Sequence, residues 1–315
     1  MKNVANYLRV LACVVGSVLV LPSVASELPL DENENGEQVL PSTGELVSRF
    51  WELEPEHKRG IYQMRTYQSN YLLPVHYTDN INIQPTSPSR GPSELQDGFK
   101  REEVKIQLSL RTKVLEDFLL PNADVWVAYT QKSLWQAWNS ADSSPFRSTD
   151  HNPEIFYVVP LAERFDLIPG PVRLQMLKVG FAHHSNGQSQ PLSRSWNYWN
   201  IGGAFEVGGF LVESAYKLRI NESDDDNPDL ERYAGNFDTR VTGIFDLSSL
   251  TVTRVSRNLS LNKGSWQLDF TYPIRKSVPD GARFHLQIFS GYGETLTDYN
   301  HYQNRIGIGI VLLNI

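Results

Sequence analysis

Cysteine is nearly absent from this sequence, and basic residues are fewer than acidic ones. The single cysteine, Cys13, lies near the N-terminus, so the rest of the chain has no thiol with which to form a disulfide. The 29 Lys and Arg against 36 Asp and Glu give a net charge of −7, with no basic stripe of the kind that phosphate backbones need. Neither common Gly-rich phosphate loop is present. These absences argue against a nucleic-acid-binding protein and against a nucleotide-dependent enzyme.

Long hydrophobic runs are also lacking, and the apolar run that does occur lies at the N-terminus. Lys2 and Arg9 precede an apolar core at 10–21, and the small residues at 24–26 follow it. This order predicts a secretory signal, residues 1–26, that is cleaved after its last residue. A retained membrane anchor is the alternative, which the short run and the cleavage site disfavour.

Cleavage would leave a mature chain of 289 residues without cysteine and take the net charge from −7 to −9. Residues 27–46 are acidic, contain Pro and Gly and show no sustained period, which predicts a flexible leader before a folded domain at 47–315. No later segment approaches 18 consecutive apolar residues, so a membrane-spanning helix is not predicted. A transmembrane β-barrel remains open, because its strands alternate and keep the average hydropathy low.

Apolar and polar residues alternate strictly in several segments, including 104–110, 266–272 and 284–288. This period of two predicts β-strands with one polar and one apolar face. Turn residues such as Pro279-Asp280-Gly281 separate such segments, and no long helical pattern or fixed repeat is present. The sequence is therefore all-β, and alternation alone leaves both a soluble sandwich and a transmembrane barrel open.

Three features favour an antiparallel transmembrane β-barrel. The strand segments often run near ten residues, about what a tilted strand needs to cross a bilayer. Aromatic residues crowd two predicted strand ends, 196–199 and 299–302, as they would in an interfacial girdle. The sequence ends in a further strand pattern, 305–315, of the kind that barrel closure uses.

The segment that carries candidate chemistry is Gly180-Phe181-Ala182-His183-His184-Ser185-Asn186-Gly187. On the predicted strand face that carries Ser185, the preceding residues are His183 and then apolar side chains. The residues on the opposite face are small or charged. In a barrel the apolar face meets lipid, so Ser185 and His183 would lie together on the outer face, where a base can take the hydroxyl proton. His184 points the other way and is the weaker candidate. An outward site of this kind would have lipid as its natural substrate.

The alternative interpretation is that His183 and Ser185 are interfacial polar residues at the end of a barrel strand. The bare pattern of a histidine two residues before a serine is not specific. The G-x-S-x-G turn expected of the commonest soluble hydrolases is missing. The assignment therefore depends on the surrounding motifs.

Those motifs resemble the outer membrane phospholipase A family. HHSNG at 183–187 is followed by SRSWN at 193–197, and further matching stretches occur in order from about residue 100 to the C-terminus. They are YTQKS at 129–133 followed by WQ, SSPFR at 143–147, DNPD at 226–229, and SGYGE at 290–294 followed by DYN. Several ordered motifs over some two hundred residues are much more specific than any one of them.

The resemblance implies a twelve-stranded outer-membrane barrel that hydrolyses phospholipid acyl esters with a Ser-His-Asn triad. The matching positions are Ser185 as nucleophile, His183 as general base and Asn197 as the residue that orients the imidazole. A neutral Asn stabilises an imidazolium less than a carboxylate does, but it avoids a bare anion beside the hydrocarbon core. The backbone amide of Gly187 matches the donor that offsets the developing oxyanion.

The resemblance also implies calcium dependence and an active homodimer. The calcium ligands carried over from the family are all oxygens, as a hard cation demands. They are the hydroxyl of Ser193, the backbone carbonyl of Gln188, the carboxylate of Asp226 and the hydroxyl of the partner subunit's Ser143. Gln131 matches a polar residue in the membrane-embedded dimer contact.

This sequence departs from the family pattern at four places. Gln188 replaces a basic residue, which leaves its carbonyl available, and Gln190 stands where some members carry a carboxylate that serves calcium binding in the monomer. Asp224, Asp225 and Asp226 run together, so the choice of ligand depends on the register. The chain ends in Ile315 rather than in the usual aromatic residue.

The leading hypothesis is thus a calcium-dependent phospholipase A of the bacterial outer membrane, which uses an acyl-serine intermediate. A non-catalytic barrel, either a channel or a structural protein, is the first alternative. Twelve strands argue against a wide pore, since water-filled porins use about 16 to 18. A soluble periplasmic serine hydrolase with a sandwich fold is the second alternative.

Overall fold

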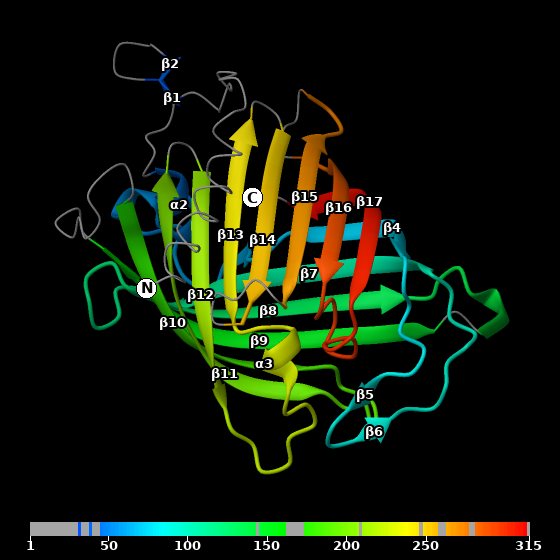
Figure 1. Cartoon of the computed structure of the whole chain (residues 1–315). Coiled ribbons are helices and arrows are strands. Elements are labelled where there is room, and N and C mark those ends of the chain that lie inside the picture. The colour runs from blue at the N-terminus through cyan, green and yellow to red at the C-terminus, as the bar shows by residue number, and fades with distance from the viewer. Residues whose placement is uncertain are drawn as a thin grey trace, which may run out of the picture.

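The computed structural model describes residues 31–32, 38–39, 45–142, 145–161, 173–207, 210–245, 248–257, 263–276 and 281–313. The predicted signal, 1–26, and most of the predicted leader lie outside these residues. Most of the described chain forms one antiparallel sheet (Figure 1). Its strands are β3 (Met64–Thr66), β4 (Asn70–Thr78), β7 (Glu102–Leu115), β8 (Asp124–Trp135), β9 (Phe146–Pro160), β10 (Arg173–Ser185), β11 (Ser195–Val207), β12 (Phe210–Ile220), β13 (Phe237–Phe245), β14 (Ser248–Ser256), β15 (Ser265–Pro273), β16 (Arg283–Gly291) and β17 (Gln303–Leu313).

Short elements accompany this sheet. They are the strands β1 (Asp31–Glu32), β2 (Gln38–Val39), β5 (Thr86–Ser87) and β6 (Gly91–Pro92), the helices α2 (Glu45–Trp51) and α3 (Leu230–Tyr233), and the 3-10 turns η1 (Pro55–His57) and η2 (Ser140–Asp142). None of the helices in the described ranges is long and apolar enough to cross a membrane.

The sheet closes on itself as a barrel of twelve strands. Each strand from β7 to β17 pairs with its successor, and the last strand, β17, pairs with β4, which pairs with β7. β3 and β4 count as one interrupted strand, because both pair with β7, at 110–112 and at 102–107 respectively. Closure leaves no unpaired edge along the barrel, which is what a sheet in hydrocarbon requires. The predicted barrel is confirmed, and the sandwich alternative is wrong.

The alternation along β10 places apolar side chains outside the barrel and polar ones inside. Leu177 and Val179 are 43% and 46% exposed, whereas Lys178 and Ala182 between and beyond them are buried. His183 and Ser185 continue the outward row by parity and are half-buried. The predicted orientation of this strand is therefore confirmed.

The aromatic girdle prediction was only partly right. Trp199 and Tyr302 are exposed, but Trp196, Tyr198 and Tyr299 are buried. Trp196 and Tyr198 alternate with Trp199 along β11 and so face the lumen. There they belong to an apolar cluster that also includes Tyr299 and Leu230. Their role is to pack the barrel beneath its loops.

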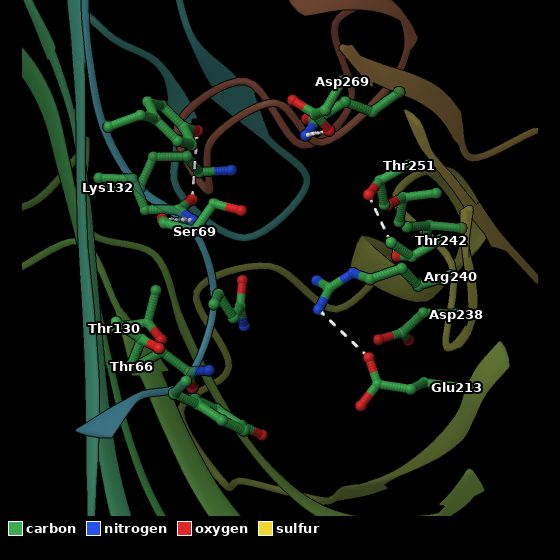
Figure 2. A pocket seen from close by; sticks show the side chains of 18 of the residues that line it. Thr66, Ser69, Thr130, Lys132, Glu213, Asp238, Arg240, Thr242, Thr251 and Asp269 are labelled. Atoms are coloured by element: carbon green, nitrogen blue, oxygen red, sulfur yellow. Dashed lines mark hydrogen bonds and ion pairs between the residues drawn. The ribbon is translucent and has the colours of Figure 1, made fainter. Parts of the chain in front are cut away.

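The lumen is polar and heavily hydrogen-bonded. A cavity of about 620 Å³ runs along it, and Figure 2 shows Lys132, Glu213 and Arg240 facing this space. At the end of the lumen where β7 and β9 begin, Arg147 contacts Glu103 at 2.7 Å and Asp298 at 2.9 Å, and Arg305 contacts Glu103 at 2.8 Å. These side chains are almost completely buried. Each of the buried charges is paired with an opposite charge, as burial requires.

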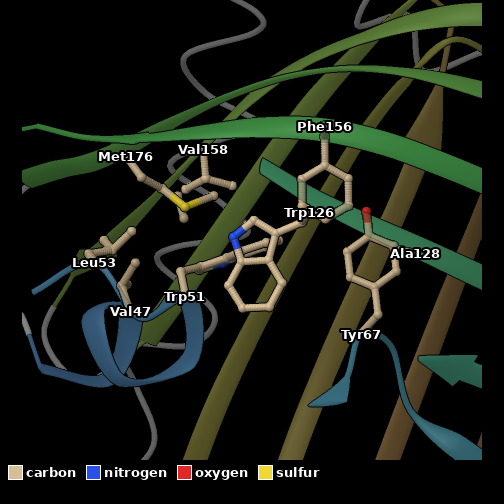
Figure 3. Packing of buried hydrophobic residues seen from close by; sticks show 10 residues of the cluster. Val47, Trp51, Leu53, Tyr67, Trp126, Ala128, Phe156, Val158 and Met176 are labelled. Carbon is tan, nitrogen blue, oxygen red and sulfur yellow. The ribbon is translucent and has the colours of Figure 1, made fainter. Parts of the chain in front are cut away.

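The other end of the lumen is filled by α2 and the residues beside it. Figure 3 shows Val47, Trp51 and Leu53 packed against barrel residues that include Trp126 and Phe156. The guanidinium of Arg111 lies over the rings of Phe50, Trp51 and Trp126, with its carbon 4.3, 4.4 and 4.9 Å from the three ring centroids. Cation–π contacts of this kind stabilise a buried cation in place of a carboxylate.

The buried ion pairs yield a stability prediction. Glu103→Gln removes the carboxylate that Arg147 and Arg305 share, and it should lower the free energy of unfolding by about 3–5 kcal/mol, because the two buried cations are then left with the single carboxylate of Asp298. Urea titration in detergent micelles, followed by heat-modifiable gel mobility, measures this loss. The matched control is Glu102→Gln at the neighbouring exposed carboxylate. Equal unfolding midpoints for the two variants would contradict the prediction.

Candidate active site

The candidate nucleophile and base lie at the C-terminal end of β10, opposite the start of β11. Pairing across the two strands places His183 opposite Asn197 and Ser185 opposite Ser195. Directly opposed residues share one face of a sheet, so Asn197 lies on the same outer face as Ser185 and His183. The predicted triad residues are therefore brought to one place by register, although Asn197 is twelve residues beyond Ser185 in the sequence.

His183 and Asn197 are joined by a hydrogen bond of 2.8 Å between Nδ1 and Oδ1. An amide oxygen only accepts, so Nδ1 of the imidazole carries the proton and Nε2 keeps its lone pair. Among the described residues no hydrogen bond joins the Ser185 hydroxyl to His183. In substrate-free enzymes such contacts are often long and tighten when substrate binds. The arrangement can thus present an imidazole with a fixed tautomer beside a serine hydroxyl.

Asn197 is itself held from the other side. Its backbone N–H and its side-chain Nδ2 both donate to Oε1 of Glu222, at 3.1 and 2.8 Å. Sequence analysis did not find Glu222, which lies 25 residues beyond Asn197 in the connection after β12. The feature that relates Glu222 to Asn197 is the pairing of β12 with β11, which places Ile220, two residues before Glu222, opposite Asn197.

His151 is a second residue that sequence analysis missed. On β9 it lies directly opposite Ser185, and on its other side it lies opposite Gln131 of β8. Its Nδ1 is 2.6 Å from the hydroxyl of Tyr129, which also donates to Gln131 at 3.3 Å. The outer face therefore carries a row of polar side chains that runs from the predicted dimer-contact residue to the nucleophile.

His184 points into the barrel, as parity predicted. Its Nε2 is 3.8 Å from the Asp150 carboxylate, and Trp196 Nε1 donates to its Nδ1 at 3.3 Å. It also lines the lumen cavity. His184 is separated from the outer-face residues by the sheet itself.

The loop after Ser185 is held in shape by Asn186. Its Oδ1 accepts from the backbone N–H of Gln188 and of Arg194, at 3.3 and 2.9 Å, and its Nδ2 donates to the carbonyl of Leu192 at 2.8 Å and to the hydroxyl of Thr297 at 3.2 Å. Gly187 follows with φ +61°, a left-handed conformation that favours glycine. The predicted oxyanion donor thus lies in a loop whose ends are tied together.

The structure brings two of the predicted calcium ligands into contact. The hydroxyl of Ser193 donates to Oδ2 of Asp226, so Asp226 is the member of the acidic run that faces Ser193. Asp225 instead pairs with Arg219 at 2.7 Å. Gln188 is in the same loop as Ser193, whereas Ser143 lies outside the described residues.

A positively charged side chain, that of Arg90, already contacts Asp226. Nε of Arg90 donates to its Oδ1 at 2.6 Å, and the other arm of Arg90 reaches Asp224 at 2.6 Å. The hydrogen bonds to Asp226 and Asp224 raise the pKa of Arg90 above its usual value, so it is charged. In the described part of the chain no group of three or more His, Cys, Asp or Glu side chains converges. The oxygens of Ser193 and Asp226 are nevertheless ligands of the kind that a hard cation takes, and Asp226 already attracts the positive charge of Arg90.

Comparison with known proteins identifies the family. The phospholipase A1 family profile matches residues 47–312. A putative phospholipase A1 of Neisseria meningitidis is 36% identical over 303 residues, which cover 94% of this chain and 76% of the relative. Phospholipase A1 of Salmonella typhimurium is 32% identical over 299 residues, which cover 95% of this chain and 96% of the relative. This chain belongs to the phospholipase A1 family.

Solved structures of family members share its fold. An active-site mutant of outer membrane phospholipase A from Escherichia coli, in which an asparagine is replaced by alanine, superimposes with a TM-score of 0.71 at 30% identity, over 87% of this chain and 98% of that one. A Salmonella typhi outer membrane phospholipase dimer with bound calcium gives a TM-score of 0.70 at 32% identity, over 82% and 94%. The resemblance seen in the motifs is therefore confirmed.

The loop geometry of this phospholipase A1 family member yields a dynamic prediction. Asn186→Ala removes four hydrogen bonds from the loop 186–194, each worth about 1 kcal/mol, so the amides of this loop should exchange with deuterium at least about tenfold faster. Hydrogen–deuterium exchange with mass spectrometry in detergent measures this. Ser189→Ala, an exposed position in the same loop, is the control. Unchanged exchange in the Asn186 variant would contradict the assigned role.

Proposed function

We propose that this protein is a calcium-dependent phospholipase A of the bacterial outer membrane that hydrolyses phospholipid acyl esters with Ser185, His183 and Asn197. The observation that carries the proposal is the hydrogen bond between His183 Nδ1 and Asn197 Oδ1 on the lipid-facing side of the barrel. Membership of a family of phospholipase enzymes supports the reaction class. The Escherichia coli active-site mutant, in which an asparagine was replaced, supports the role of Asn197.

The residues support a two-step acyl transfer. His183 Nε2 takes the proton of the Ser185 hydroxyl as its oxygen attacks the ester carbonyl carbon. When the carbon–oxygen bond of the ester breaks, the imidazolium gives that proton to the leaving alkoxide, which departs as lysophospholipid. A water molecule then gives a proton to His183 and attacks the acyl-serine, and the fatty acid leaves while Ser185 regains its proton. The amide of Gly187 is the proposed donor to the oxyanion.

Calcium would be held by the hydroxyl of Ser193, the carboxylate of Asp226, the carbonyl of Gln188 and the hydroxyl of the partner subunit's Ser143. When bound, it would offset negative charge that develops on the ester carbonyl oxygen. The contact between Ser193 and Asp226 supports two of these ligands. The Salmonella typhi neighbour, a dimer with bound calcium, supports both the metal and the homodimer. An ion shared between two chains makes activity depend on dimerisation, which suits an enzyme surrounded by its own substrate.

The outer membrane is the proposed location, and export by a signal at 1–26 is the proposed route. Apolar rows on the outside of the barrel and relatives described as outer membrane phospholipases support the location. The channel alternative loses support, because aromatic side chains around α2 fill one end of the lumen. The row of polar side chains at Ser185 faces away from the lumen and so has no role in a pore.

The proposed nucleophile and metal are tested together by fatty-acid release from phospholipid in mixed detergent micelles. Wild type with calcium should release fatty acid, and Ser185→Ala should lower the rate by about a thousandfold or more. Excess chelator should abolish wild-type release. Ser195→Ala, which removes a hydroxyl from the opposite strand on the same face, is the matched control. No release by folded wild type in calcium would overturn the proposed function, and release that survives chelation would overturn calcium dependence.

Arg90 yields a separate prediction for metal binding. Its guanidinium must leave Asp226 before a metal ion can take both carboxylate oxygens, so Arg90→Gln should tighten calcium binding by about two- to fivefold, the scale of an ion pair near the protein surface. Isothermal titration of calcium into dimeric Ser185→Ala protein, with and without Arg90→Gln, measures this free of turnover. Arg101→Gln is the control for net charge. Equal calcium affinities in the Arg90 and Arg101 variants would contradict the competition.

A further inference from the structure

The carboxylate of Glu222 contacts Asn197 at two atoms, and nothing in the mechanism above uses it. Oε1 of Glu222 accepts from Nδ2 of Asn197 at 2.8 Å and from its backbone N–H at 3.1 Å. We propose that Glu222 is a positioning residue that fixes the Asn197 amide for His183 and supplies the negative charge that an Asn-containing triad lacks. This inference rests on the proposed function of Ser185, His183 and Asn197.

Glu222 determines which way the Asn197 amide faces. An Asn side chain can present either its oxygen or its nitrogen to a neighbour after a half-turn. A carboxylate only accepts, so Glu222 requires the nitrogen of Asn197 on its side and thereby directs the oxygen to Nδ1 of His183. That oxygen in turn requires the proton on Nδ1, which leaves Nε2 free to act as base. One carboxylate thus determines the tautomer of the histidine through the amide between them.

Glu222 also holds the backbone of Asn197. Ile220, the last residue of β12, lies opposite Asn197, so the β11–β12 ladder ends at this pair. The N–H of Asn197 is then satisfied by the carboxylate of Glu222 rather than by a further strand residue. Main chain and side chain of Asn197 are therefore fixed by the same oxygen, which limits rotation about the bonds between them.

Glu222 also brings a negative charge close to His183. When His183 takes the serine proton, a positive charge appears on the imidazolium, and the neutral amide beside it offsets that charge only weakly. Glu222 places a carboxylate behind the amide, on the side of Asn197 away from His183. Nearby cations have other partners: Arg219 pairs with Asp225, Lys217 with Asp238 and Arg90 with Asp224 and Asp226. No ion pair to Glu222 occurs among the described residues, and His151 on β9 and Tyr129 on β8 are further titratable groups on this face.

The test compares Glu222→Gln with wild type in the fatty-acid release assay. The glutamine oxygen still accepts a hydrogen bond, but the charge is lost. We expect kcat to fall about tenfold with KM unchanged, and the acidic limb of the pH–rate profile to move to lower pH, because an imidazolium without a nearby anion loses its proton more readily. Glu222→Ala removes the hydrogen bond as well and should lose more activity. Heat-modifiable gel mobility verifies that each variant is folded.

Glu231→Gln is the matched control for these variants. Glu231 lies in α3 of the same connection and also accepts from an asparagine side chain, Nδ2 of Asn236, at 3.1 Å. The substitution therefore removes the same charge from the same kind of contact without touching Asn197. Its kcat and pH profile should equal those of wild type.

A charge swap gives a result that a merely structural role would not produce. Asn197→Asp alone places two carboxylates against each other and should impair activity strongly. In the double variant Asn197→Asp with Glu222→Gln, the new carboxylate at position 197 accepts from His183 and from the glutamine amide, so activity should return to at least the level of Glu222→Gln. If wild type is active and Glu222→Gln matches Glu231→Gln in kcat and pH profile, the inference about Glu222 is wrong while the proposed function stands. If wild type itself is inactive, the proposed function fails first.

Discussion

A closed antiparallel sheet gives each strand side chain only two places to go, the lumen or the outer surface. Neighbours along a strand alternate between the two sides, and partners across strands share a side. Once one side chain is known to face the lumen, the direction of every other strand side chain follows. In β10 the assignment is made by Leu177 and Val179, which are exposed, and by Lys178, which is buried. Charges such as Glu103 and Arg147 then fill the interior, where they pair with each other. The outward face is left for apolar side chains and for the few polar residues that the site needs.

The same rule assembles the site. His183, Asn197 and Ser185 come from two strands of one hairpin, and their common face follows from the register between β10 and β11. Backbone hydrogen bonds of the barrel hold these positions, so little ordering is needed when a lipid arrives. The outward direction also suits the proposed role of Asn197 as third residue of a triad, since an amide tolerates the neighbourhood of hydrocarbon better than a carboxylate does.

The sequence was sufficient for those features that depend on alternation or on extended motifs. The outward placement of Ser185 and His183 and the inward placement of His184 follow from a period of two, whereas the barrel follows from that period together with strand lengths and the extended motifs. The aromatic girdle was over-assigned because alternation applies to aromatic residues too: Trp196 and Tyr198 face inward for the same reason that Trp199 faces outward.

Residues whose role depends on where a strand ends or a loop returns could not be predicted in this way. Arg90 and Glu222 lie outside the barrel strands, and their partners Asp226 and Asn197 are far away in the sequence. His151 lies within a strand, but its position opposite Ser185 requires the register between β9 and β10, which no local pattern carries. Their partners are fixed by tertiary structure alone.

The connection after β12 links the two halves of the proposed chemistry. Glu222 at its start holds Asn197, and Asp226 accepts from Ser193 in the loop that follows the nucleophile. Between these contacts, Oδ1 of Asn227 accepts the backbone N–H of Ser195 at 3.0 Å, so the connection is tied to β11 as well as to the loop. A displacement of this connection therefore moves the carboxylate behind the triad together with the carboxylate at the cation site. In the proposed mechanism Glu222 would offset the positive charge on His183 and Asp226 would hold the calcium that offsets the oxyanion, so the geometry of one short segment would govern both sides of that charge separation.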